Sequence, residues 1–310
     1  MRIFDAAATR AALPFARLVP ALGAMFASGC VVPPRHVHEV GAPGSGAGFT
    51  SLVMPAWLEG RYYGIKVVNI AAANAVRGLP GLHASYLLHD AATGVPLALV
   101  DGDELTARRT AATSALAASW LARTDARRLL VVGGGRVARL LPEAFRAVRG
   151  ISHVAIWARA LAQAETLAVE WRDAGFDAAA ANDLDNAVAG AEIVSCATLA
   201  TAPLVRGRHL RDGSHLDLIG SFTPAMREAD DDCFAGAAIY VDTAEALTKS
   251  GDLLGPLQRG VFAAADVRGT LEALARGEAV GRRSATERTV FKAVGSGLAD
   301  LAAAILVFEG

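Results

Sequence analysis

The 310-residue chain has few cysteines and almost no net charge. Its three cysteines, Cys30, Cys196 and Cys233, are far apart and form no C-x-x-C pair, so they suggest neither a disulfide framework nor a zinc site and fit a reducing, cytoplasmic location. A formal net charge of −1 gives no bulk attraction for nucleic acid. The sequence also lacks G-x-S-x-G and H-E-x-x-H, the signatures of common hydrolase and metalloprotease chemistry.

Long uncharged runs are scarce as well. The stretch 18–30 is uncharged and ends in small residues, as a signal peptide does, but Asp5, Arg10 and Arg17 fit an amphipathic helix and argue against secretion. Elsewhere a charge interrupts each apolar stretch, as Asp300 does in GSGLADLAAAILVFEG. We therefore expect no membrane span.

From residue 128 onward, strand and helix patterns alternate. This alternation predicts a doubly wound parallel sheet, since parallel neighbours need helical crossovers. The predicted strands are 129–132, 153–159, 176–181, 192–198, 215–221 and 238–243, with helices at 136–148, about 160–174 and 184–191.

The first hundred residues differ and predict a separate α+β layer with strands at 64–70, 84–90 and 95–101. The glycine-rich segment 41–48 predicts a loop or hairpin. A helix at 105–122, with Thr106 as its N-cap, bridges the two regions. The apolar spacing of Val290, Val294, Leu298 and Leu301 predicts one helix through 287–310. The expected domains are 1–118 with 289–310, and 119–288.

A glycine-rich turn lies where the first strand of the parallel sheet ends. LVVGGGRVARLL places Gly133, Gly135 and Ala138 in a G-x-G-x-x-A spacing between a buried strand and a helix. A turn alone could explain the glycines, but this order of elements is the dinucleotide-binding fingerprint, in which the pyrophosphate approaches the helix N-terminus. Arg136, Val137 and Thr198, at the end of the strand 192–198, complete the predicted cofactor set.

The end of the following strand bears on the choice of nucleotide. NAD-specific versions of this fold carry an acid there for the ribose 2′-hydroxyl. This chain has Arg159 instead, a suitable partner for a 2′-phosphate. NADP(H) is favoured, with NAD(H) as the alternative; Arg159 could also simply end the strand in solvent.

Three cations stand at unusual positions. Lys66 interrupts an apolar strand, so it either faces solvent, which composition alone favours, or meets an anion. Arg109 is expected in the first turn of the bridging helix, where the dipole disfavours a cation without an anion nearby, and the alternative is an ordinary surface arginine. Arg35 follows two prolines and could be a solvated strand end. His36 and His38 alternate on the same segment, but without an acidic or cysteine partner at ligand spacing we expect no metal.

Several segments together resemble the ornithine cyclodeaminase/mu-crystallin family over nearly the whole chain. These are PPR at 33–35, the stretch 66–118 ending in LTARRTAATSALAA, GGGRVA at 133–138, GSFTPAMRE at 220–228 and TVFKAVG at 289–295. The resemblance implies a homodimer whose first segment and C-terminal helix form a substrate-binding and dimerisation domain beside a Rossmann domain. It also implies that Arg35, Lys66 and Arg109 meet a substrate carboxylate, with Met54 and Thr110 in the same pocket, which reverses the solvent interpretation of Lys66.

Two positions depart from the cyclodeaminases that the chain resembles. Their G-x-D-x-P segment carries an aspartate for amine activation and proton transfer, and here that position is Phe222. Val137 is a second departure, because the family often has glutamine there. A phenyl ring cannot transfer a proton, which costs a step needing acid–base help about 10²- to 10⁴-fold. Imine reduction needs that help less.

The resemblance therefore favours an NAD(P)H-dependent reductase of a cyclic imino acid, in which Lys66 is the catalytic residue and Phe222 lines the substrate site. The expected reactions convert Δ1-pyrroline-2-carboxylate or Δ1-piperideine-2-carboxylate to L-proline or L-pipecolate. Two alternatives stay open. One is an NAD-dependent ornithine cyclodeaminase, and the other is an NADPH-linked binding protein like mu-crystallin with little turnover.

Overall fold

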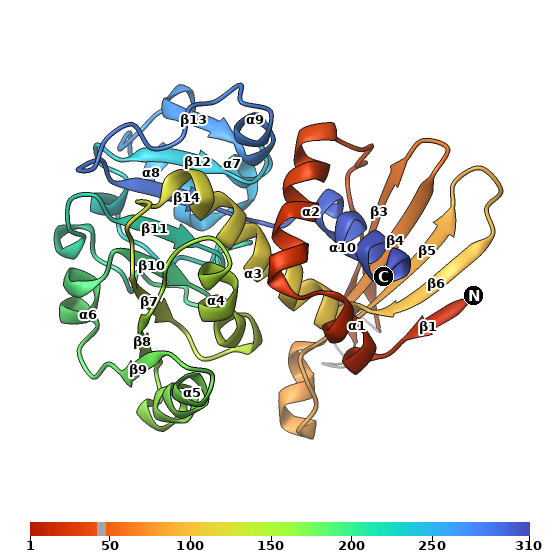
Figure 1. Ribbon diagram of the computed structural model, residues 1–310, viewed down its shortest axis with the longest axis horizontal. Coiled ribbons are helices and arrows are strands. Elements are labelled where there is room, and N and C mark those ends of the chain that lie inside the picture. Colours follow the sequence, from red (N-terminus) through yellow and green to blue (C-terminus); the bar gives the residue numbers. More distant parts are fainter. Residues whose placement is uncertain (42–47) are drawn as a thin grey trace. The chain divides into compact units, whose positions relative to one another are not determined.

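The computed structural model describes residues 1–41 and 48–310, which divide into two compact units (Figure 1). The first unit contains Met1–Arg109 and Ser296–Gly310, and the second contains Thr110–Gly295. Most of the glycine-rich segment predicted as a loop or hairpin, residues 42–47, lies outside the described residues.

The first unit is built on a mixed six-stranded sheet in the order β1-β6-β5-β4-β3-β2. Strand β1 runs parallel to β6, and the remaining neighbours pair antiparallel. The strands are β1 (Arg2–Phe4), β2 (His36–Val40), β3 (Phe49–Leu58), β4 (Tyr62–Ile70), β5 (Leu82–Asp90) and β6 (Pro96–Asp101).

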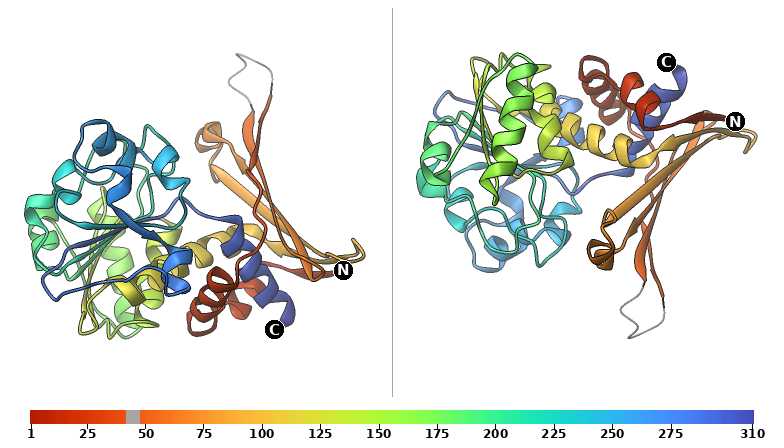
Figure 2. Two further views of the ribbon diagram at one scale, coloured as in Figure 1. Left: turned by 90° about the horizontal axis from the view of Figure 1, so that it is seen from above. Right: turned by 90° about the horizontal axis from the view of Figure 1, so that it is seen from below.

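Helices cover one face of this sheet. Helix α10 (Gly297–Glu309) packs on β3, β4, β5 and β6, with α2 (Phe15–Ser28) beside it (Figure 2). Short elements complete the unit: α1 (Ala6–Ala12) and the 3-10 helix η1 (Ala72–Arg77). Within the described part of the chain, no single helix has the length and apolarity to cross a membrane; the pair α1 and α2, bent by 75°, meets that criterion on length and composition only.

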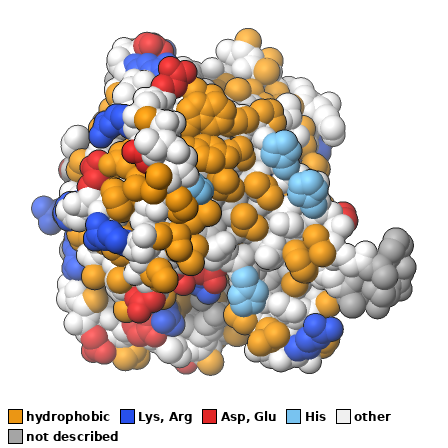
Figure 3. Space-filling view, turned by 90° about the vertical axis from the view of Figure 1, so that its right-hand side faces the viewer, with side chains coloured by type: hydrophobic (Ala, Val, Ile, Leu, Met, Phe, Trp, Pro, Cys, Tyr) orange, Lys and Arg blue, Asp and Glu red, His pale blue; other side chains and the backbone are white. Residues whose placement is uncertain are grey.

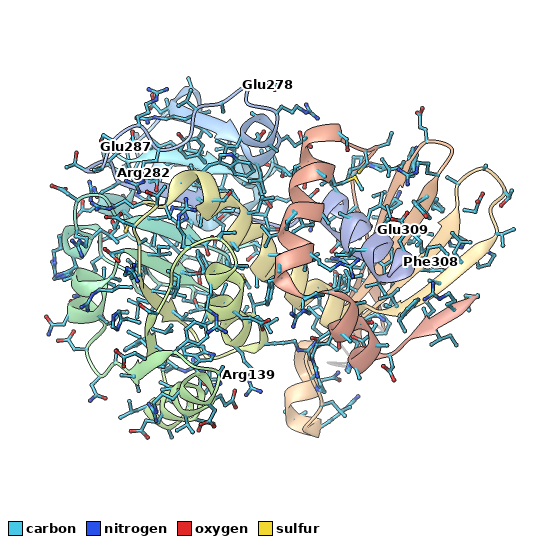
Figure 4. All side chains as sticks on the ribbon, viewed as in Figure 1. Arg139, Glu278, Arg282, Glu287, Phe308 and Glu309 are labelled. Atoms are coloured by element: carbon cyan, nitrogen blue, oxygen red, sulfur yellow. The ribbon has the colours of Figure 1, made fainter. Side chains whose placement is uncertain are left out.

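The end of α10 is fastened to the sheet. Tyr62 Oη donates to Glu309 Oε1 at 2.9 Å, and Arg2 Nη1 donates to the Phe308 carbonyl at 2.6 Å (Figure 4). The rings of Tyr62 and Phe308 also meet edge to face. These contacts fix the helix over the strands and so fix the side chains that α10 presents to them.

The second unit contains an all-parallel eight-stranded sheet in the order β13-β12-β14-β11-β10-β7-β8-β9, which confirms the predicted Rossmann-type fold. Its core is formed by the apolar residues of the central strands, such as Leu130, Val194 and Leu216. The strands are β7 (Arg128–Val132), β8 (His153–Trp157), β9 (Asp177–Ala180), β10 (Ile193–Cys196), β11 (His215–Leu218), β12 (Ala238–Val241), β13 (Val267–Thr270) and β14 (Thr289–Lys292).

Helices connect these strands. The longest is α3 (Gly102–Leu121), which continues from the first unit into the second. The others are α4 (Arg136–Arg146), α5 (Leu161–Asp173), α6 (Leu184–Gly190), α7 (Ala246–Lys249), α8 (Gly251–Gln258) and α9 (Leu271–Ala275), with 3-10 helices η2 (Gly207–His209), η3 (Asp231–Cys233) and η4 (Ala264–Asp266).

Two predicted helix starts are wrong. Helix α3 begins at Gly102, where the Asp101 carboxylate accepts from the Glu104 N–H at 2.8 Å, so Thr106 lies inside the helix and is not its cap. The C-terminal segment is strand β14 followed by helix α10, rather than one helix, because β14 pairs with β11 and β12 and Ser296 caps α10. The predicted boundary at 288/289 therefore placed a strand of the parallel sheet in the first domain.

Candidate functional site

Lys66 is buried inside the first unit. Side chains alternate along β4, and Gly64, Lys66 and Val68 face the helices, so Lys66 is only 2% exposed. Its neighbours across the sheet are Met54 on β3 and Tyr86 on β5. The solvent interpretation of Lys66 is wrong, and a buried ammonium group needs an anion.

Asp300, on α10, is that anion. Its Oδ2 lies 2.6 Å from Lys66 Nζ, and its Oδ1 accepts from Arg109 Nε at 2.7 Å. Asp300 is 1% exposed and stands in the first turn of α10, where the helix dipole favours an acid. The polar cluster Lys66–Asp300–Arg109 thus joins a strand and two helices of the first unit.

The cluster holds more positive than negative charge. Burial raises the pKa of Asp300, but Arg109 and Lys66 outweigh it and lower that pKa below its ordinary value. Burial lowers the pKa of Lys66 to about 8; Asp300 opposes this, whereas Arg109 and Arg35 add to it. Two cations therefore share one internal carboxylate, and the excess charge suits a bound monoanion such as a substrate carboxylate.

The predicted substrate residues are divided between the two units. Met54 is 8% exposed and faces Lys66 in register, and Arg35 is half-buried just before β2. Arg109 lies farther into α3 than expected, because that helix begins at Gly102. Thr110 follows it on α3 and is the first residue of the second unit. Phe222 lies in the second unit, 41% exposed, on the loop after β11.

Two further residues belong to the site and are not among the predicted site residues. In the sequence, Asp300 interrupts an apolar stretch, and one acid in the buried face of a helix is itself a signal of a buried partner. Tyr86 is 1% exposed, and burial raises the pKa of its hydroxyl well above the ordinary value, with Asp300 adding to the rise. Its ring occupies the space beside Gly64, where an added Cβ would lie 2.0 Å from the Tyr86 hydroxyl oxygen.

The dinucleotide loop of the second unit follows β7, and its three glycines differ in their surroundings. Gly133 has φ 123°, and an added Cβ would lie 2.5 Å from the Ala197 carbonyl, so the fold itself requires glycine there. A Cβ added at Gly134 would lie 2.5 Å from the Gln163 side chain, whose Nε2 donates to the Gly134 carbonyl at 2.8 Å.

Gly135 has no such constraint from the described part of the chain. Its φ is −81°, it is the N-cap of α4, and a Cβ there would meet no described atom within 4 Å. The first N–H groups of a helix have no intrahelical partner and attract anions. The packing of the described residues does not require glycine at position 135, whereas a phosphate bound at the helix N-terminus would need the space that a side chain there would fill.

The remaining predicted cofactor residues surround this loop or follow a neighbouring strand. Ala138 is fully buried in the first turn of α4, while Arg136 is exposed and Val137 half-buried. Arg159 is exposed after β8, and Thr198 is half-buried after β10. Strand β7 pairs with β8 on one side and β10 on the other, and ligands of such sheets bind where the strand order reverses.

We expect Gly133→Ala and Gly135→Ala to have different effects. Gly133→Ala should lower the melting temperature, because the positive φ and the contact with Ala197 strain any side chain. Gly135→Ala should keep the wild-type melting temperature and weaken dinucleotide binding, measured by quenching of intrinsic fluorescence. Unchanged cofactor affinity in Gly135→Ala would contradict the phosphate site.

Comparisons with known proteins identify relatives of most of the chain. The family described as "Ornithine cyclodeaminase/mu-crystallin family" matches residues 33–310. A Δ1-pyrroline-2-carboxylate reductase from Paracoccus denitrificans is 44% identical over 254 residues, covering 81% of this chain and 80% of the relative.

Solved structures agree with the fold. A Δ1-pyrroline-2-carboxylate reductase from Thermococcus litoralis, solved with NADH and L-proline, has a TM-score of 0.93 and 29% identity and covers 100% of this chain and 97% of its own. An archaeal alanine dehydrogenase dimer with bound NAD has a TM-score of 0.91 and 27% identity, covering 100% and 95%. The family predicted from the sequence is thereby confirmed.

Proposed function

Because the chain belongs to the ornithine cyclodeaminase/mu-crystallin family, we propose that it reduces a cyclic imino acid with NAD(P)H. The chain is an NAD(P)-dependent oxidoreductase of this family. The proposed substrates are Δ1-pyrroline-2-carboxylate or Δ1-piperideine-2-carboxylate, reduced to L-proline or L-pipecolate. The observation that carries the proposal is the buried Lys66–Asp300–Arg109 cluster, with its excess of positive charge.

The cluster can bind the carboxylate of such a substrate and supply a proton to its imine nitrogen. Arg109 and Lys66 bind the carboxylate through charge-assisted hydrogen bonds, and Asp300 orients both cations. The loop of Gly133, Gly135 and Ala138 would hold NAD(P)H, which would supply the hydride for the imine carbon. With a pKa of about 8, Lys66 is protonated at neutral pH and can deliver the proton that the imine nitrogen takes up.

Phe222 favours imine reduction over cyclodeamination. It stands where the cyclodeaminases that the chain resembles carry an aspartate, and its side chain can neither accept nor donate a proton. Ornithine cyclodeamination must release ammonia and depends on that acid–base step. The Δ1-pyrroline-2-carboxylate reductases among the relatives support the same choice.

For the cofactor we propose a preference for NADPH over NADH. The support is Arg159, an exposed cation directly after β8, where an acid would favour the 2′-hydroxyl of NAD. The Thermococcus litoralis relative holds NADH, so both cofactors belong in the assay. A clear preference for NADH would contradict the role of Arg159.

We also propose a homodimer formed through the face of the six-stranded sheet that lies opposite α2 and α10. Residues that alternate with the buried ones, including Val53, Ile65, Val67, Leu87 and Leu99, face outward and are incompletely buried. Figure 3 shows apolar side chains gathered over this side of the first unit. Large apolar patches mark interaction sites, and the related alanine dehydrogenase is a dimer. Sedimentation should give twice the 32.0 kDa chain mass, whereas a monomer would contradict the proposal.

The proposed function is tested with the purified chain and three substrates. Δ1-pyrroline-2-carboxylate and Δ1-piperideine-2-carboxylate are each assayed with NADH and NADPH by absorbance, and L-ornithine is assayed with NAD by ammonia release. We expect consumption of reduced cofactor with at least one imine and no ammonia from ornithine. Failure with both imines contradicts the proposal. Ammonia release would indicate the cyclodeaminase, and tight NADPH binding without any turnover would indicate a binding protein.

A further inference from the structure

A buried carboxylate joins two loops at the carboxyl edge of the parallel sheet. Glu228 is fully buried, and its Oε1 accepts from the Thr198 N–H at 2.7 Å and the Thr198 hydroxyl at 2.8 Å. Its Oε2 accepts from the Gly220 N–H at 2.7 Å. Thr198 follows β10 and Gly220 follows β11, so one side chain connects the loops of two adjacent strands.

The loops after β10 and β11 are closely packed against each other. A Cβ at Gly220 would lie 1.9 Å from the Thr198 carbonyl oxygen and 2.5 Å from Glu228 Oε1, which explains the glycine of GSFTPAMRE. A Cβ at Gly133 would lie 3.3 Å from the Thr198 methyl group. The loop that Glu228 holds is therefore the one that packs against the dinucleotide loop.

Glu228 is itself held in place. The Asp252 carboxylate accepts from the N–H groups of Glu228 at 2.8 Å and Ala229 at 3.1 Å. Lys292 Nζ lies 3.6 Å from Asp252 Oδ2 and donates to the Leu218 carbonyl, at the end of β11, at 3.0 Å. Asp252 and Lys292 are fully buried, so they hold the backbone at Glu228 in place at this edge of the sheet.

We propose that Glu228 is a positioning residue for the dinucleotide, which holds the loops after β10 and β11 against the glycine loop and thereby sets cofactor affinity. This rests on the proposed function only in that the dinucleotide occupies the glycine loop. Parallel sheets bind ligands outside their carboxyl ends, where these loops lie. Gly220 also lies near the start of the loop that carries Phe222, so the same carboxylate holds the first part of that loop.

The test is Glu228→Gln, which keeps the size of the side chain. Each carboxylate oxygen of Glu228 accepts from a backbone N–H, and Oε1 also accepts from the Thr198 hydroxyl. A glutamine has only one oxygen, so in either orientation its amide nitrogen faces a backbone N–H donor. We expect the Kd for NADH, measured by fluorescence titration, to rise at least about tenfold, as loss of a hydrogen bond to a charged group predicts. Hydrogen exchange should become faster at the backbone amides of Thr198 or Gly220.

Two variants separate positioning from general stability. Asp217→Asn alters another fully buried carboxylate of the same unit, which accepts from Ser195 within the sheet, and should keep the wild-type Kd for NADH. Glu228→Asp keeps the charge but is too short to reach all three donors, so it should weaken NADH binding as well. An equal loss in Asp217→Asn, or wild-type affinity in Glu228→Gln or Glu228→Asp, overturns the proposal. Because NADH binding is measured without turnover, a chain that reduces no imine still tests Glu228.

Discussion

Asp300→Asn is expected to lower the free energy of unfolding by about 3–5 kcal/mol, the usual cost of removing one partner from a buried ion pair. Lys66 and Arg109 would then face each other inside the first unit without the carboxylate that both contact. Chemical denaturation of the purified protein measures the loss. Glu170→Gln, which breaks the surface pair of Glu170 with Arg139, is the control and should leave stability near wild type (Figure 4).

The pH dependence of this stability follows from the direction of the Asp300 shift. Its pKa in the folded protein is lowered, so the wild-type carboxylate stabilises the fold above its ordinary pKa of 3.8 and loses that contribution as the pH falls through the lower folded value. Asparagine does not titrate. The stability difference between wild type and Asp300→Asn should therefore narrow in acid, and a constant difference down to pH 2 would contradict the ion pair.

Asp300→Asn should also shift the pH dependence of kcat/KM. In the free wild-type enzyme Lys66 loses its proton near pH 8, so kcat/KM for the imino acid should fall as the pH rises through about 8. Asp300 raises the pKa of Lys66, and its removal lowers that pKa further. We therefore expect kcat/KM of Asp300→Asn to fall at a lower pH than kcat/KM of the wild type. An unshifted fall would mean that Lys66 does not control it.

Much of the fold followed from local patterns, and the errors have identifiable causes. The buried strands after residue 128 and the glycine turn were found because apolar runs and glycine spacing are local signals. The prediction of a helix over strand β14 is wrong, because Val290, Val294, Leu298 and Leu301 have helical spacing although β14 is a strand. Pairing with β11 and β12, which are distant in the sequence, decided its structure instead.

In the candidate site, too, local sequence signals predict single residues but not the long-range contacts between them. Lys66 and Arg109 were noticed because cations at those positions are unusual, but their common partner Asp300 lies 191 residues beyond Arg109 in the chain. Glu228 belonged to a recognised motif, yet its role depends on the loops after β10 and β11 meeting at one edge. Both carboxylates act across long sequence distances, which local patterns do not report.

Lys66→Met should lower kcat/KM for the imino acid by about 10²- to 10⁴-fold, because it removes both a cation for the carboxylate and the proposed proton donor. It should cost less stability than Asp300→Asn, since Arg109 still pairs with Asp300 and the methionine is suited to a buried position. The Kd for NADPH should stay within about twofold of wild type, because Lys66 belongs to the first unit and the glycine loop to the second.

The contrast between Lys66→Met and Asp300→Asn is the sharpest test of the cluster. If Lys66 only balanced Asp300, its loss would leave a carboxylate still paired with Arg109 and an enzyme near wild-type activity. If Lys66 binds substrate, activity collapses while the fold and the cofactor affinity persist. Arg61→Met removes an exposed cation from the same unit and should change neither kcat/KM for the imino acid nor the Kd for NADPH. A joint loss of turnover and NADPH affinity in Lys66→Met would instead place Lys66 among the residues that support the cofactor.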